Sequence, residues 1–302
     1  MTGRTGLVRI RRAWFAALLL GAVASSVQAG DLLLPEWEYE PKLQDSRIKR
    51  AATRTAQVSY SFVNDTITDT WTLTTSPVRW RAKGWLTLGG IAGVTTGMVF
   101  LVDERVRNAV QGSDGCEDFT DIIRYVGNGP GLLALTGGFA ATGLIFDRPK
   151  ERETARLLME ASVIAYGFGA AAKFTLGRSR PGAEQGPKDF HPFSGEFSMP
   201  SGETTSAFVM AGIITSQYPS WPVQILAYSL AAAVGAGRIL SDGHWTSDVF
   251  LGAALGIAVS KSVVYLNRRR KAAREQRRSA HPRLSRHFIQ VSTRGFLWTY
   301  RF

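Results

Sequence analysis

Residues 204–237 read TTSAFVMAGIITSQYPSWPVQILAYSLAAAVGAG and contain no charged side chain. The only interruption is YPSWP at 218–222, and proline residues end helices and favour turns. This stretch therefore predicts two apolar helices joined by a tight connection. Charged side chains stand immediately outside it, at Glu203 and Arg238. Paired helices without internal charge are typical of a membrane-embedded bundle.

Four further apolar stretches extend this pattern. They are residues 84–102, 130–146, 157–174 and 249–266. A stretch of about 20 apolar residues is long enough to cross a bilayer, and the many Gly and Ala residues suit close helix packing there. The sequence thus predicts an all-α fold, a six-helix transmembrane bundle over residues 84–266. A polar N-terminal segment precedes the bundle, and a basic C-terminal tail, 267–302, follows it.

The residues before the bundle divide into two parts. Residues 1–29 contain an arginine-rich start, an apolar run from Trp14 to Val23 and a small-residue cleavage site. This order is typical of an export signal, and the short apolar run favours a cleaved signal over a retained anchor. Residues 30–83 are polar, and the alternation in VSYSFV (58–63) and DTWTL (69–73) is typical of two short strands.

The composition limits the partners of the chain. The formal net charge is +12, which suits nucleic acid, anionic lipid or phosphate substrates. The positive residues gather beside the apolar stretches, so orientation in a membrane explains them better than nucleic acid binding. A single cysteine, Cys116, and four histidines argue against an intramolecular disulfide and a Cys- or His-rich metal centre. The sequence leaves the oligomeric state open.

The basic clusters also predict an orientation. Placing residues 79–83, 147–156 and 268–278 on the cytoplasmic side is consistent with six spans. The loops 175–203 and 238–248 then face outward. A cleaved signal would instead leave residue 30 outside, unless another segment before residue 84 crosses. A soluble exported helical protein would remove this conflict, but the long uncharged runs argue against it.

Several cations and a turn stand at the edges of these outward loops. Lys173 precedes Arg180-Pro181, and a planar guanidinium can bind two phosphate oxygens while an ammonium adds a point charge. Alone, either residue is better explained as a cation at the lipid headgroups, and Arg178 is expected to be one. Ser201-Gly202 precedes the fourth helix, where it predicts an anion site or an ordinary helix cap.

His244 and Asp248 are four residues apart, so they share one face if residues 244–248 are helical. Asp248 can accept a hydrogen bond from one ring nitrogen and thereby fix the tautomer. The other nitrogen is then free to attack or to accept a proton. Alone, the pair is also typical of an interfacial histidine beside a helix-capping aspartate.

Taken together, the three blocks resemble the signature of the type 2 phosphatidic acid phosphatase superfamily. KFTLGRSRP at 173–181 matches its Lys-x6-Arg-Pro motif. PSGETTSAF at 200–208 matches Pro-Ser-Gly-His except that Glu203 replaces the histidine. GRILSDGHWTSD at 237–248 matches the third motif, with Gly237 where serine is usual. Three ordered motifs with these spacings between apolar helices are highly specific.

The resemblance implies a covalent mechanism. His244 is expected to be the nucleophile that forms a phosphohistidine, and Asp248 to orient it. The residues expected to bind the phosphoryl oxygens are Lys173, Arg180, Ser201, Gly202 and Arg238. The second-motif histidine, here Glu203, is expected to protonate the leaving group. The resemblance implies no metal and no other cofactor, since these cations neutralise the transition-state charge.

Glu203 is the departure from the pattern. A helix N-terminus and nearby cations favour its carboxylate form, whereas burial and a bound phosphate dianion favour its protonated form. His191, in the loop before the second motif, is an alternative proton donor. Pyrophosphates and other substrates with good leaving groups need this proton least.

The predicted function is that of a membrane phosphatase acting on lipid-linked phosphate or pyrophosphate. The alternatives are a lipid phosphotransferase with the same site, and a weakly active or non-catalytic phospholipid-binding relative. Vanadate-dependent haloperoxidases share this kind of site, but their soluble helical domains do not suit the apolar runs. The predicted location is a bacterial-type inner (cytoplasmic) membrane, with the site facing the periplasm. The particular lipid stays open, and phosphatidate, phosphatidylglycerophosphate, undecaprenyl pyrophosphate and lipid A all fit.

Overall fold

A computed structural model describes residues 46–110, 117–280, 290–292 and 295–297. The expected export signal at 1–29 lies outside the described residues. The chain divides into two compact units, Met1–Arg54 and Thr55–Phe302. Apart from the first residues of helix α2, the elements below belong to the second unit.

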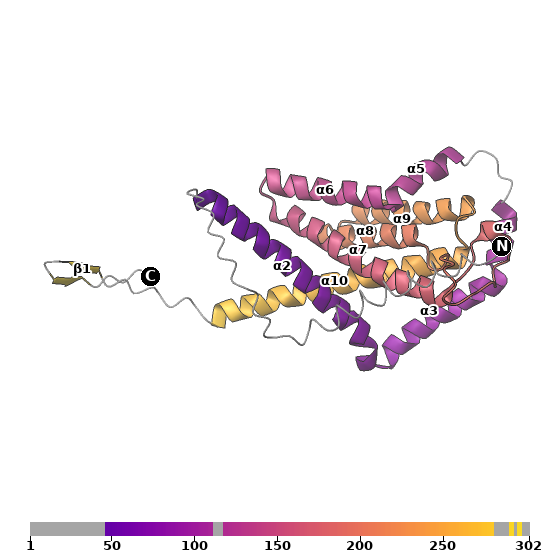
Figure 1. Ribbon diagram of the computed structural model, residues 1–302, viewed down its shortest axis with the longest axis horizontal. Coiled ribbons are helices and arrows are strands. Elements are labelled where there is room, and N and C mark those ends of the chain that lie inside the picture. Colours follow the sequence, from indigo (N-terminus) through magenta and orange to yellow (C-terminus); the bar gives the residue numbers. More distant parts are fainter. Residues whose placement is uncertain (1–45, 111–116, 281–289, 293–294, 298–302) are drawn as a thin grey trace, which may run out of the picture. The chain divides into compact units, whose positions relative to one another are not determined.

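The described part of the chain is almost entirely helical (Figure 1). The elements are α2 (Ser46–Thr75), the 3₁₀ turn η1 (Ser76–Arg79), α3 (Ala82–Leu101), α4 (Asp103–Val110), α5 (Glu117–Gly127), α6 (Gly129–Ile145), α7 (Pro149–Leu176), the 3₁₀ turn η2 (Pro181–Ala183), α8 (Gly202–Gln217), α9 (Trp221–Leu240), α10 (Thr246–Ala280), β1 (Gln290–Ser292) and β2 (Gly295–Leu297). The strands form one short antiparallel hairpin. The predicted all-α class is confirmed.

Each of the six predicted apolar stretches lies in a helix. Four helices are long and apolar enough to cross a membrane, namely α3, α7, α9 and α10. Helix α6 is a shorter apolar helix, and α8 has 16 residues. The chain is therefore a multi-pass membrane protein, while the count of six crossings stays a prediction.

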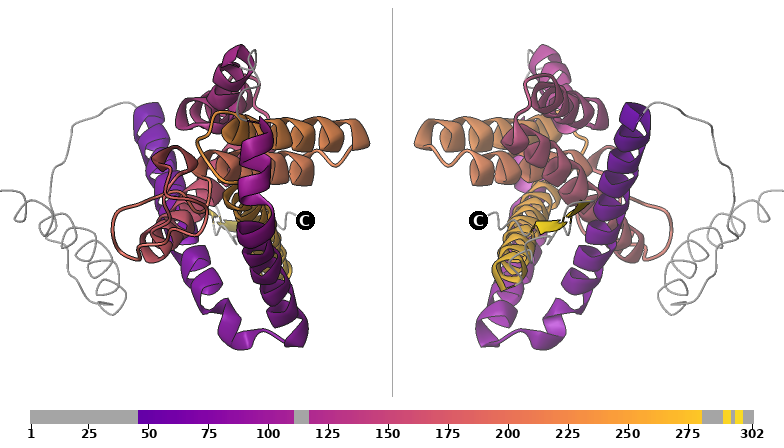
Figure 2. Two further views of the ribbon diagram at one scale, coloured as in Figure 1. Left: turned by 90° about the vertical axis from the view of Figure 1, so that its right-hand side faces the viewer. Right: turned by 90° about the vertical axis from the view of Figure 1, so that its left-hand side faces the viewer.

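The two predicted strands are wrong. Residues 58–63 and 69–73 lie within α2 rather than in strands. The basic cluster at 147–156 falls mostly in the first turns of α7. Within α2, the hydroxyls of Thr66 and Thr70 donate to the carbonyls four residues earlier, which lets threonine side chains remain inside a helix. The chain turns at η1, so that α2 and α3 form a V in both views of Figure 2.

Buried ion pairs attach α2 to the bundle. Asp69 of α2 is 2% exposed and pairs with Arg270 of α10. Arg270 also lies 3.2 Å from Glu160 of α7, while Arg156 bridges Glu160 and Asp65 at 2.8 and 3.4 Å. Arg270 belongs to the basic tail that the sequence places at the membrane surface. The structure directs its side chain to buried carboxylates instead, because these would otherwise be left without a counter-charge.

The core that positions the site lies among α7, α8, α9 and α10. Fully buried Leu158, Val209, Val234 and Val263 come from these four helices in turn. Helices α8 and α10 approach so closely that a Cβ at Gly252 would lie 2.7 Å from the Ser201 carbonyl oxygen. Glycine at this position therefore brings the Ser201 turn against the start of α10.

Candidate functional site

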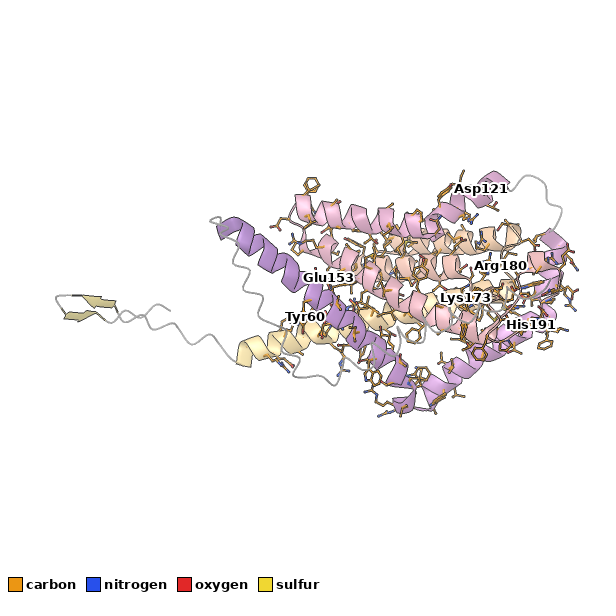
Figure 3. The ribbon with its side chains drawn as sticks, viewed as in Figure 1. Tyr60, Asp121, Glu153, Lys173, Arg180 and His191 are labelled. Carbon is orange, nitrogen blue, oxygen red and sulfur yellow. The ribbon has the colours of Figure 1, made fainter. Side chains whose placement is uncertain are left out.

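The predicted site residues meet where α7 and α9 end and α8 and α10 begin. Gly177 ends α7 in the left-handed conformation, and the loop that follows returns the chain to Ser201, the N-cap of α8. Lys173, Arg180 and His191 are labelled at this end of the bundle in Figure 3. Electrostatic interactions link Arg180 to Lys173, Arg238 and His244. The cations of the first and third motifs thus share one site.

His244 and Asp248 form the centre of the site. His244 is 4% exposed, and its Nδ1 lies 3.6 Å from Asp248 Oδ2. This separation is longer than a hydrogen bond, and Nδ1 is a buried atom without a hydrogen-bond partner. A shift of less than about 1 Å would close the contact and commit Nδ1–H to Asp248. Nε2 would then remain available for chemistry.

Asp248 is held in place by several donors at once. Its Oδ2 accepts from the Ser198 hydroxyl at 2.5 Å and from the Trp245 backbone N–H at 3.0 Å. Its Oδ1 accepts from Arg178 Nη1 at 2.6 Å. These three partners come from two loops, so the carboxylate keeps its position when His244 moves or reacts.

Arg178 is not the interfacial cation that the sequence predicts. It is fully buried, and its Nη2 donates to Asp103 Oδ2 at 2.8 Å. Asp103 also accepts from the backbone N–H and the hydroxyl of Ser247, at 2.8 and 2.5 Å. Arg178, Asp103, Ser247 and Asp248 thus form one buried polar network behind His244. Sequence reasoning missed Arg178 and Asp103, because a lone charge at the end of an apolar stretch resembles any interfacial residue.

Burial determines the charge of the nucleophile candidate. The pKa of His244 is lowered from its ordinary 6.5, chiefly because burial disfavours the imidazolium, while the nearby Asp248 carboxylate opposes this shift. Lys173 and Arg180 lower it further. His244 is therefore neutral at neutral pH, which is the form a nucleophile needs.

Two members of the predicted phosphate-binding set are fixed by backbone contacts. Lys173 Nζ donates to the Phe197 carbonyl at 2.7 Å. The Ser201 N–H donates to the Asp248 carbonyl at 3.0 Å, and Ser201 caps α8 through a contact with Thr204. A Cβ at Gly202 would meet open space within 4 Å, so the start of α8 faces free volume. A helix N-terminus with free space before it suits an anion.

Arg238 lies against the turn that carries His244. A Cβ at Gly243 would lie 2.2 Å from Arg238 Nη2, so any larger residue there would force the guanidinium to shift. Arg238 Nε lies 2.7 Å from Glu203 Oε2, although its N–H is not aligned for a hydrogen bond. Glu203 Oε1 lies 3.5 Å from Arg124 Nε of α5. Glu203 is thus paired with two cations, and Arg124 is a site residue that no motif predicted.

His191 has a partner outside the central pair. Its ring is 58% exposed, and Nε2 lies 2.9 Å from Asp189 Oδ1. The backbone around it closes the loop onto α7, because the His191 N–H donates to the Gly177 carbonyl at 2.7 Å. Its role as a proton donor stays a prediction. Among the described residues, no group of three or more His, Cys, Asp or Glu side chains could hold a metal ion.

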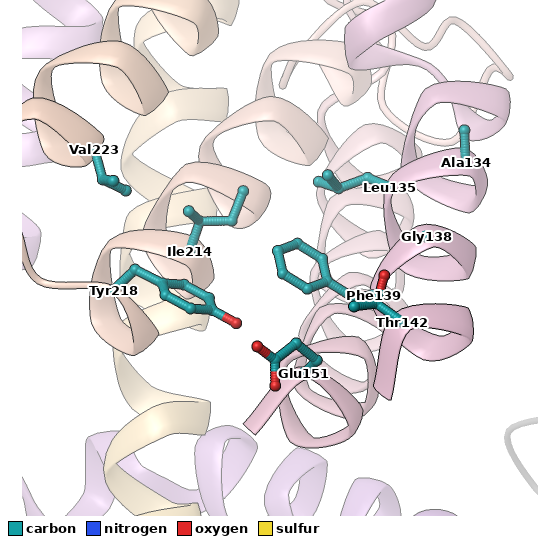
Figure 4. Close-up of a pocket in the computed structure, with 9 residues that line it drawn as sticks. All are labelled: Ala134, Leu135, Gly138, Phe139, Thr142, Glu151, Ile214, Tyr218 and Val223. Atoms are coloured by element: carbon teal, nitrogen blue, oxygen red, sulfur yellow. The ribbon is translucent and has the colours of Figure 1, made fainter. Parts of the chain in front are cut away.

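Two apolar pockets lie along α6, α8 and α9. One has a volume of about 370 Å³, is lined by Tyr125 and Val126 near the site, and continues to Leu135 and Ile214. The other has a volume of about 590 Å³ and shares Leu135 and Ile214. Figure 4 shows its far end, where the Tyr218 hydroxyl and a carboxylate from α7 face one another. The two pockets adjoin at these shared residues, and we refer to them together as the apolar groove.

Comparison with known proteins gives one family. Residues 155–272 match the PAP2 superfamily. A lipid A 1-phosphatase from Porphyromonas gingivalis is 35% identical over 98 residues, which cover 32% of this chain and 20% of that protein. The match thus spans about one fifth of the length of that relative.

Two solved structures are also similar. A transmembrane PAP2-type phosphatidylglycerolphosphate phosphatase from Bacillus subtilis aligns with a TM-score of 0.49 and 21% identity, over 60% of this chain and 94% of that chain. LpxE from Aquifex aeolicus aligns with a TM-score of 0.42 and 21% identity, over 54% of this chain and 95% of that chain.

Proposed function

We propose, from the premise that residues 155–272 belong to the PAP2 superfamily, that this chain is a membrane phosphatase acting on lipid-linked phosphate or pyrophosphate. The observation that carries the proposal is the neutral, buried His244 beside a fixed Asp248, within reach of Lys173, Arg180 and Arg238. A nucleophile next to an orienting carboxylate and several cations is suited to phosphoryl transfer.

The proposed reaction has two steps. His244 Nε2 attacks phosphorus while Lys173, Arg180 and Arg238 neutralise the charge on the three equatorial oxygens. The N–P bond forms as the P–O bond to the lipid breaks. Water then hydrolyses the phosphohistidine and releases inorganic phosphate. Asp248 stabilises the positive charge that develops on the imidazole, because Arg178 and Ser198 hold it in place throughout.

The apolar groove supports a lipid as the substrate. It begins at Tyr125 and Val126, directly after Arg124, and it runs between α6, α8 and α9. An acyl or prenyl chain in this groove would leave its phosphate at the site. The proposed location is a bacterial-type inner membrane with the site facing outward. This orientation puts the turns at 146–148 and 218–220 on the cytoplasmic side, beside the basic start of α7.

The direct test is phosphate release by the purified full-length protein in detergent, from a panel of lipid phosphates and pyrophosphates. We expect release that depends on His244 and a phosphoenzyme that is stable in base and labile in acid. The matched variant is His244→Ala. Equal background rates in both proteins over the whole panel would refute the proposed function.

A further inference from the structure

The side chain at the proton-donor position is not arranged to give up a proton. Glu203 Oε2 lies 2.7 Å from Arg238 Nε, and Oε1 lies 3.5 Å from Arg124 Nε. Two guanidinium groups beside one carboxyl group stabilise its anion. A carboxylate in this state can accept a proton but has none to donate. A substrate whose leaving group requires protonation is therefore expected to be cleaved slowly.

Arg124 is held beside Glu203 by the packing of α5. A Cβ at Gly127, one turn after Arg124, would lie 3.1 Å from the Glu203 carbonyl oxygen and 2.4 Å from Val234 Cγ1. Helix α5 therefore touches the first turn of α8 directly. The Arg124 side chain remains 57% exposed, so its guanidinium is accessible to a ligand. A cation thus stands next to the group that would face the leaving oxygen.

We propose that Arg124 and Glu203 form a leaving-group site that selects lipid diphosphates over lipid monophosphates. The proposal rests on the proposed phosphatase function. A monophosphate ester departs as an alkoxide, which needs a proton. A diphosphate departs as a phosphate monoester anion, which needs none and gains from a nearby cation. The terminal phosphoryl group would occupy the Lys173, Arg180 and Arg238 set, and the second phosphate would contact Arg124.

The bonds and protons balance without a proton donor. His244 Nε2 forms the N–P bond while the bond from the terminal phosphorus to the bridging oxygen breaks. The electron pair leaves with the lipid monophosphate. Water then attacks the phosphohistidine, the N–P bond breaks, and the imidazole recovers its electron pair. Glu203 accepts the proton of the attacking water and passes it to solvent as inorganic phosphate leaves.

The test compares two substrates with the same chain, farnesyl monophosphate and farnesyl diphosphate. We expect the full-length protein to have the higher kcat/KM for the diphosphate. Arg124→Gln should lower that value about 10- to 100-fold, the effect of losing one charged hydrogen bond, and change the monophosphate value little. Arg124→Lys should retain most of the diphosphate activity. Arg105→Gln, which removes an exposed arginine from the neighbouring α4, should alter neither value.

The outcomes separate the two proposals. If neither substrate is cleaved faster than by His244→Ala, the phosphatase function fails and the leaving-group site fails with it. If both are cleaved through His244 but the monophosphate is preferred, only the leaving-group site is refuted. The leaving-group site is also refuted if Arg124→Gln lowers kcat/KM equally for the monophosphate and the diphosphate, because a structural defect would act on both substrates.

Discussion

The proposed reaction has two proton transfers, one to the leaving group and one from the attacking water. A histidine at position 203 could perform both of them, whereas the glutamate found there is suited to only one. An imidazole can donate in the first step and accept in the second. Glu203, paired with Arg238 and Arg124, is suited to the second step only. The residue is therefore expected to govern hydrolysis of the phosphoenzyme rather than its formation.

This division predicts the behaviour of Glu203→Gln. With a diphosphate substrate, the variant should still form the phosphohistidine but hydrolyse it about 10²- to 10⁴-fold more slowly, the range for losing a general base. Rapid-quench measurements should show a burst of one lipid monophosphate per active site, followed by slow turnover. The control variant is Asp189→Asn, which changes the residue that pairs with His191. Linear product formation without a phosphoenzyme would contradict the prediction.

The lowered pKa of His244 gives a second prediction. Burial disfavours the imidazolium, so the ring stays neutral below its ordinary pKa of 6.5. The nucleophile is therefore retained as the pH falls through 6.5 and lost only at more acidic pH. Because the unfolded chain binds this proton more tightly, acidification below 6.5 also destabilises the fold.

The measurement is an NMR titration of protein labelled at histidine, with His244→Asn to assign the resonance. We expect a midpoint below 6.5 for His244. A His244 midpoint above 6.5 would show that Asp248 outweighs burial, and would overturn the prediction.

At the scale of elements, the buried polar network connects the start of α4, the loop after α7 and the start of α10. Removing Arg178 would leave Asp103 and Asp248 buried without their cation. Breaking a buried pair on one side costs about 3–5 kcal/mol. We expect Arg178→Ala to lower the unfolding free energy in detergent by about this amount. Arg105→Ala should change it by less than about 0.5 kcal/mol, and equal stability of both variants would contradict the role of the network.

The groove between α6, α8 and α9 gives a prediction about chain length. Ala227 lines the groove on α9, so Ala227→Trp should fill it. We expect KM to rise for long-chain lipid phosphates while kcat/KM for a short-chain, water-soluble phosphate is unchanged. Ala232→Trp, an exposed position on the same helix, is the control. An equal loss of activity toward the long-chain and short-chain substrates would show that the lipid chain does not bind in this groove.

How much could be predicted from the sequence depends on how far apart the interacting residues are. His244 and Asp248 are four residues apart at the start of α10, with His244 two residues before the helix, so their spacing in the sequence already brings them close together. Arg178 and Asp103 are 75 residues apart, and no local pattern relates them. Helix α2 was missed because alternation over five or six residues does not separate a strand from a helix. Arg124 stands outside every motif, and only the packing of α5 against α8 brings it to the site.

For the whole molecule, the proposed orientation can be measured by labelling introduced cysteines, because the sequence has a single cysteine to remove first. Cys116 would first be replaced by serine. Ser194→Cys places a thiol in the exposed site loop, and Ser220→Cys places one in the exposed turn between α8 and α9. A membrane-impermeant maleimide should label Ser194→Cys in intact cells, but Ser220→Cys only after permeabilisation. The reverse pattern would invert the proposed topology.

The composition of the buried polar network has a consequence for the chemistry. It contains two carboxylates, Asp103 and Asp248, around one guanidinium, Arg178, so its formal charge is −1. This excess negative charge lies behind His244, away from solvent. In the proposed reaction the imidazole becomes positive on forming the N–P bond, and the sum then rises from −1 to zero. The counter-charge for that proposed intermediate is therefore fixed in the folded state before any substrate arrives, which would be electrostatic preorganisation.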